Sequence, residues 1–142
     1  MDSYRDGLRS SYLLRAQSML VSAGALAARG SDAAVGPALR AELERASELI
    51  FKALRVSLGL SASRERDLLA LLQVSGLEEA IALTGLRGAT IAIVTCAASP
   101  TLDAEVAAKW LTELRTVADV VGRMPPPTRD PIRRRATPRP RR

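Results

Sequence analysis

The last twenty residues confine the folded part of this chain to the residues that precede them. Residues 123–142 contain eight arginines, one acidic residue and the run Pro125-Pro126-Pro127. Such a segment has too few apolar side chains to form a core and too much like charge to collapse. The sequence therefore predicts a compact partner-binding domain over residues 1–122 and a disordered basic tail over residues 123–142.

The net charge of +6 belongs to the tail and not to the domain. The whole chain has 21 basic and 15 acidic residues. Eight of the basic residues and one of the acidic residues lie in the last twenty. Residues 1–122 therefore contain 13 basic and 14 acidic residues, a net charge of −1. A nearly neutral body with a polycationic extension indicates that phosphate contacts, which need no particular sequence, are made chiefly by the extension.

Residues 37–56 show the clearest helical pattern. Pro37 stands where a first helical turn tolerates proline, and apolar residues then recur at steps of three and four. These are Leu39, Leu43, Ala46, Ile50 and Leu54. A similar stripe, with Val106, Trp110 and Leu114, predicts another helix that starts near Ser99-Pro100-Thr101.

Two short helices are predicted between these long ones. Ser61 or Ser63 can cap a helix that carries the leucines of residues 68–72. Ser75 and Glu78 have the spacing of a capping box, which opens a helix that continues through Leu83. Gly85 is then well placed to end this helix in the left-handed conformation.

Residues 90–97 predict a strand. The run Thr-Ile-Ala-Ile-Val-Thr-Cys-Ala is β-branched, apolar and continuous, which is typical of a strand covered on both faces. A strand needs partners for its backbone, and residues 19–23 and 117–121 are the candidates. Residues 1–30 themselves fit either a helix or a strand. The predicted fold class is α+β, a small single domain with helices packed on a short mixed sheet.

The composition argues against catalysis. The chain has no histidine, which removes the usual general base and the commonest metal ligand, and its single cysteine cannot form a thiolate zinc site. Glu78 and Glu79 point about 100° apart on a helix, so they do not face one site. Cys96 is expected to be a buried apolar residue. We therefore expect no enzyme activity, no cofactor, no metal and no small-molecule substrate, although an enzyme that uses only arginines and carboxylates is the alternative.

No segment has the length of a membrane span. The longest stretches without charge, residues 16–28 and 88–102, are shorter than the roughly 18–20 apolar residues required. Asp2 and Asp6 also disfavour a signal peptide, which needs a positive start. A cytoplasmic protein without a membrane partner is expected.

The candidate binding residues are arginines and one tryptophan-containing helix face. Arginine pairs with phosphates and stacks on exposed bases, which suits RNA. The candidate nucleic-acid contacts are Arg64, Arg66, Arg133, Arg134, Arg135, Arg139, Arg141 and Arg142. Trp110 and Leu114 are the candidate contacts with a protein partner, since tryptophan is enriched at interface hot spots. For Trp110, the helical spacing favours a core position, and the partner contact is the alternative.

Residues 53–97 resemble a known family. The pattern consists of a helix ending at residues 53–55, leucines 68–69, the string Leu77-Glu78-Glu79-Ala80-Ile81, Gly85, and the apolar run 91–94. It is similar to the small TPRKB-type accessory subunit of KEOPS, the complex that makes threonylcarbamoyladenosine on tRNA. Residues 74–76 depart from the family, which often has an arginine–glutamine pair there.

The resemblance implies a mixed α/β fold and a non-catalytic role. It implies docking onto the kinase-like KEOPS subunit and recognition of the 3′ CCA end of tRNA. The competing hypothesis is a mostly helical structural or assembly module, whose arginine tail binds nucleic acid nonspecifically.

Overall fold

The computed structural model describes residues 3–29 and 35–126, and within these ranges it contains helices and no strand. The helices are α1 (Ser3–Ala28), α2 (Val35–Ser57), α3 (Leu68–Leu72), α4 (Leu77–Leu83), α5 (Arg87–Ala98) and α6 (Ala104–Arg123). The prediction of an α+β fold with helices on a mixed sheet is therefore wrong. Most of the predicted tail, residues 127–142, lies outside the described residues.

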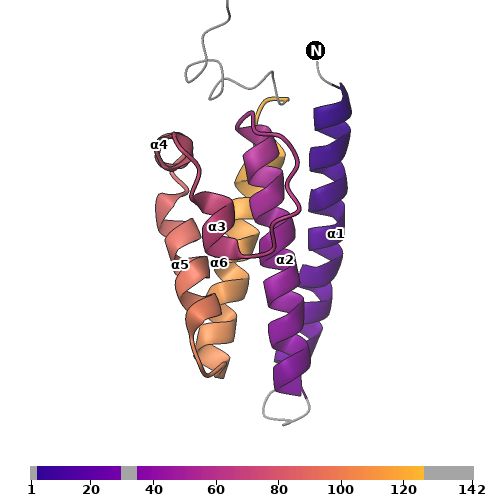
Figure 1. Cartoon of the computed structure of the whole chain (residues 1–142). Helices are drawn as coiled ribbons and strands as arrows, with labels where there is room; N and C mark the ends of the chain where they lie inside the picture. Colours follow the sequence, from indigo (N-terminus) through magenta and orange to yellow (C-terminus); the bar gives the residue numbers. More distant parts are fainter. Residues whose placement is uncertain (1–2, 30–34, 127–142) are drawn as a thin grey trace, which may run out of the picture.

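The four long helices form a bundle, and the two short ones cover part of its side. Helix α1 packs along α2, α2 packs on α6, and α6 packs on α5 (Figure 1). The short helix α3 lies beside α2, while α4 contacts α5 at the junction between them. This order leaves α1 at one edge of the bundle and α5 at the other (Figure 1).

Helix α2 is the centre of the core. The predicted stripe from Leu39 to Leu54 is buried, which confirms the helix and its apolar face. The buried surface is wider than that stripe, since Leu49, Phe51 and Ala53 are also at most 1% exposed. The reason is that α2 has neighbours on several sides, namely α1, α3 and α6.

The predicted strand at residues 90–97 lies inside α5. Its buried residues, Thr90, Ile93 and Cys96, are spaced by three and therefore share one helical face. A short apolar run does not by itself distinguish a strand from a buried helix, and here the packing against α6 decides. The predicted partner strands, residues 19–23 and 117–121, lie within α1 and α6.

Residues 3–28, for which the sequence left helix and strand open, form the single helix α1. Its buried apolar residues are Leu13, Ala16, Leu20 and Ala23, whose steps of three and four match the helical alternative. Gly24 is tolerated because the side chain of Arg115 on α6 packs against it, 3.3 Å from where a Cβ would stand.

The helix ends agree with the sequence at some positions and differ at others. Gly85 has φ of +78° just after α4, which confirms the predicted left-handed stop. The predicted serine caps are wrong: Asp67 caps α3, where its carboxylate accepts from the Ala70 amide at 3.0 Å. Gly76 occupies the N-cap of α4 without a side-chain hydrogen bond, so the predicted capping box does not form.

Candidate functional site

Trp110 and Leu114, the predicted contacts with a partner, lie in the core. Both side chains are 0% exposed. Trp110 Nε1 donates a 2.9 Å hydrogen bond to Ser47 Oγ on α2, and Ser47 Oγ donates to the Leu43 carbonyl at 2.7 Å. These contacts hold α6 to α2 and satisfy both polar groups inside the bundle. The prediction that these two side chains meet a partner on the surface is corrected accordingly.

Arg40 on α2 connects this core to the C-terminal end of α5. Its guanidinium lies 5.9 Å from the centroid of the Trp110 ring and donates to the carbonyls of Ala97 and Ser99 at 3.2 and 2.7 Å. These bonds satisfy carbonyl groups at the end of α5, which has no further helical turn to bond them. The arginine is therefore a structural clamp and not a surface cation for phosphate.

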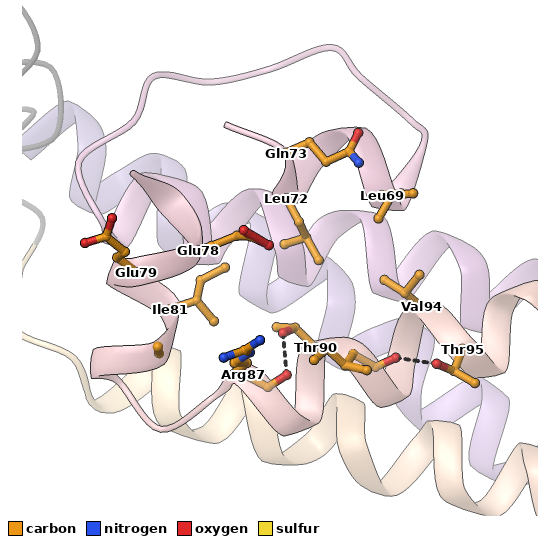
Figure 2. Close-up of a pocket in the computed structure, with 12 residues that line it drawn as sticks. Leu69, Leu72, Gln73, Glu78, Glu79, Ile81, Arg87, Thr90, Val94 and Thr95 are labelled. Carbon is orange, nitrogen blue, oxygen red and sulfur yellow. Dashed lines mark hydrogen bonds between the residues drawn. The ribbon is translucent and has the colours of Figure 1, made fainter. Parts of the chain in front are cut away.

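An apolar groove of about 480 Å³ opens where α3, α4 and α5 meet (Figure 2). Ile81 and Thr90, each 3% exposed, form its floor. Leu69 and Ile91 stand on its walls and remain 48% and 55% exposed. Aliphatic side chains that stay this exposed next to a concave surface are typical of a binding site for an apolar group.

The hydroxyl groups in the groove are already used. Thr90 Oγ1 donates to the Arg87 carbonyl at 2.9 Å, and Thr95 Oγ1 donates to the Ile91 carbonyl at 2.8 Å (Figure 2). Both bonds turn the hydroxyl hydrogens into the helix that carries them. The inner surface of the groove therefore presents mainly methyl and methylene groups.

Charged groups occupy the rim of the groove and not its floor. Figure 2 shows Glu78 directed toward Leu72 over the opening and Glu79 directed away from it. This agrees with the predicted separation of adjacent residues on a helix. Arg87, at the start of α5, is also exposed. The rim therefore has two carboxylates and one guanidinium, an excess of negative charge.

A second hollow, of about 590 Å³, adjoins the groove along α3 and α5, and Leu69 and Val94 line both. Arg66 lies in it together with Arg45, as the only basic residues among those that line it. The same surface carries the carboxylates of Glu44, Glu48 and Asp67. Glu48 is paired with Arg45 and Lys52, and Glu44 lies 3.7 Å from Arg40 Nη1. The charges around this hollow are therefore close to balanced, and the surroundings of Arg66 do not form the basic patch that a phosphate backbone prefers.

Glu48 in this hollow is the centre of a buried ion cluster. Its Oε2 accepts from Lys52 Nζ at 2.7 Å and from Arg45 Nη1 at 2.8 Å, and the Glu48 and Lys52 side chains are 8% and 9% exposed. Burial by itself raises the pKa of the Glu48 carboxyl, but the hydrogen bonds and charges of Lys52 and Arg45 outweigh burial and lower this pKa below that of an ordinary glutamate. Glu48 is therefore a carboxylate held by two cations, which suits a structural role better than that of a proton acceptor.

The other predicted nucleic-acid residues are not brought together in the described part of the chain. Arg64 is exposed on the segment between α2 and α3 and lines neither hollow. The tail residues Arg133, Arg134, Arg135, Arg139, Arg141 and Arg142 lie outside the described residues. The tail remains the predicted site of phosphate contact.

Cys96 is buried on α5, as expected, and burial raises the pKa of its thiol. Within residues 3–29 and 35–126, no three histidine, cysteine or carboxylate side chains converge on a point where a metal ion could bind.

None of the helices in the described ranges is both long and apolar enough to cross a membrane alone. Only α4 and α5 taken together reach the length and composition of a span, and they are bent by 118° where they join.

The groove was not predicted, although one sequence signal points to it. Residues 68–72 have the sequence Leu-Leu-Ala-Leu-Leu. In a helix of 5 residues these four leucines point in different directions, so they cannot all be buried in one core. Leu71 is buried, whereas Leu69 on the other side of α3 is exposed. No protein-family model, curated protein or solved structure matches this chain, so its role has to be argued from its own residues.

Proposed function

We propose that this chain is a non-catalytic assembly module. Its helical body binds a protein partner through the groove between α3, α4 and α5, and its arginine-rich C-terminal segment binds nucleic acid without sequence preference. The observation that carries the proposal is the groove, with Leu69 and Ile91 exposed on its walls. The lack of histidine in the whole sequence supports the non-catalytic part.

The chemistry of the groove favours a protein segment over a small polar ligand. Small-molecule sites usually place a few polar groups inside the pocket to fix the orientation of the ligand. Here the threonine hydroxyls donate to carbonyls of their own helix, and the charges lie at the rim. A partner segment with one or two aliphatic anchors and flanking charges would fill this surface, as amphipathic segments do in other apolar grooves.

The KEOPS resemblance does not support this proposal. It implies a mixed α/β fold, whereas the residues that carry it from Leu77 to Val94 lie in α4, α5 and the turn between them. An accessory subunit of KEOPS that binds the kinase-like subunit and the tRNA 3′ CCA end therefore stays a prediction. The tRNA experiment below separates it from nonspecific binding.

Site-specific photocrosslinking tests the groove. A benzoylphenylalanine in place of Ile91 should form a discrete adduct with one protein in cells that naturally make this chain. The matched control is the same probe in place of Thr116, which is exposed on α6 away from the groove. Adding Leu69→Glu should remove the Ile91 adduct. Identical products at both positions, or none at Ile91, would overturn the proposal.

Binding of tRNA tests the C-terminal segment. The full chain is compared with a variant in which the last six arginines, from Arg133 to Arg142, are glutamine. Each arginine–phosphate contact releases counterions, so the affinity of the full chain for tRNA should fall steeply as the salt concentration rises. The glutamine variant should bind little tRNA at any salt concentration. Removal of the CCA end should change nothing. A preference for intact tRNA that survives the arginine changes would instead favour the KEOPS prediction.

A further inference from the structure

The last described residues of the chain lie between α1 and the C-terminal end of α4. Arg9 on α1 donates through Nη1 to the carbonyls of Met124 and Pro125, at 3.2 and 3.0 Å. Met124 in turn lines a shallow depression together with Thr84, the residue that ends α4. Met124, two residues before the end of the described chain, therefore lies beside the C-terminal end of α4, whose first turn carries Glu78 and Glu79.

We propose that the C-terminal segment of this chain, residues 127–142, occupies the α3–α4–α5 groove of its own body and is displaced by the protein partner. This inference rests on the proposed function, because it assigns a competitor to the same groove. It implies that a partner in the groove releases the arginines of the segment, so protein binding and nucleic-acid binding reinforce each other.

The segment has the side chains that the groove requires. Ile132 is its one large aliphatic residue, and Arg133, Arg134 and Arg135 follow directly. An isoleucine matches the methyl-lined interior between Leu69 and Ile91. The arginines match the excess of carboxylates on the rim, where Glu78 and Glu79 face one cation, Arg87.

The distances allow this contact within one molecule. Helix α4 has 7 residues, so about 10 Å separate Thr84 from the groove end of the helix. Ile132 follows Pro126 after six steps along the chain, which can span up to about 20 Å. Tethering of this kind gives an effective concentration in the range of roughly millimolar, so even a weak contact is populated.

Disulfide trapping tests the contact directly. In a full chain with Cys96→Ala, Ile132→Cys is combined with Leu69→Cys in the groove and, as the control, with Thr116→Cys. Thr116 is exposed on α6 and lies about 12 Å along the helix from Met124. Under mild oxidation we expect the intramolecular disulfide to form several times faster with position 69. Equal rates for the two pairs would overturn the inference.

Binding of single-stranded RNA to the full chain tests the coupling. Ile132→Ser should raise the affinity about three- to tenfold, because a segment that no longer spends time in the groove is free to bind phosphate. Glu78→Gln with Glu79→Gln should act in the same direction at low salt, whereas Ile132→Leu should leave the affinity unchanged. Unchanged affinity in both Ile132→Ser and the glutamine variant would overturn the coupling.

The two proposals fail in different ways. If the chain binds no RNA, the nucleic-acid part of the proposed function is wrong. The comparison of disulfide rates still shows whether residues 127–142 contact the groove. If the photocrosslink at Ile91 captures a partner but the disulfides form at equal rates, the groove binds protein and the C-terminal segment does not compete for it.

Discussion

The central pair α2–α6 and the wall, defined here as the outer surface formed by α3, α4 and α5, differ in how deeply their side chains are buried. Between α2 and α6, the polar groups of Trp110 and Ser47 are buried and hydrogen-bonded to each other. On the wall, the apolar side chains of Leu69, Leu83 and Ile91 are 48%, 87% and 55% exposed. The side chains of the first region pack against each other and stabilise the fold. Several apolar side chains of the second region remain exposed to solvent.

This difference follows from helix length and position. Helices of 23 and 20 residues present several turns of one apolar face and can bury it against each other. Helices of 5 and 7 residues expose apolar side chains because they have too few neighbours to cover every face. We therefore expect substitutions in the central pair to change stability strongly, and those on the wall to change binding instead.

The largest effect should come from Trp110→Ala. The indole is 0% exposed and bonded to Ser47, so its removal leaves a cavity and should lower the free energy of unfolding by about 4 kcal/mol. Trp110→Phe keeps most of the volume and should cost distinctly less. Urea titration followed by circular dichroism measures both. A small effect of Trp110→Ala would mean that α6 does not pack on α2 as described.

The next effect concerns the ion cluster around Glu48 on α2. Glu48→Gln leaves the buried ammonium of Lys52 without its carboxylate and should lower the free energy of unfolding by about 3 kcal/mol at neutral pH. The pKa of Glu48 is lower in the folded state, so its contribution is complete above its unfolded pKa and disappears as the pH falls through the folded value. Unfolding curves recorded from neutral pH downward should therefore converge for the two proteins. A constant difference would show that the charge of Glu48 does not matter.

A pair of substitutions in α5 separates the two regions within one helix. Ile93 is 0% exposed, and Ile91 is 55% exposed on the groove. Ile93→Ala should lower the free energy of unfolding by about 2.5 kcal/mol and Ile91→Ala by less than about 0.5 kcal/mol. In a strand the two residues would lie on one face and respond alike. Equal effects in thermal unfolding would therefore favour the strand over the helix.

The smallest effects are expected at two glycines of the wall, with opposite signs. Gly85 has φ of +78°, and nothing lies within 4 Å of an added Cβ, so Gly85→Ala costs only backbone strain, about 1 kcal/mol. Gly88 lies within α5 with the same free space. Gly88→Ala should raise the free energy of unfolding by roughly 0.5 kcal/mol, because alanine favours the helix. A change of the same sign at both positions would contradict these backbone assignments.

The sequence predicted the long amphipathic helices better than it predicted the site. The stripe from Leu39 to Leu54 and the face with Trp110 and Leu114 are periodic over many turns, and both are buried helix faces in the structure. The core position that the spacing favoured for Trp110 is confirmed, whereas its alternative as a partner contact is wrong. The pattern left both open, because it gives the apolar side of a helix and not what covers it. The groove escaped prediction because its residues come from three separate helices.

The sequence by itself determined where the chain turns and which faces are apolar. Gly85 ends α4 because only glycine adopts its backbone angle without strain, and that property needs no neighbour. Only the tertiary structure decided that residues 90–97 are helical. The β-branched run fits a strand or a buried helix, and a strand would need pairing partners. The backbone groups of residues 19–23 and 117–121 form hydrogen bonds within α1 and α6, so they cannot pair with a strand. The backbone of residues 90–97 therefore forms its hydrogen bonds within its own helix, α5.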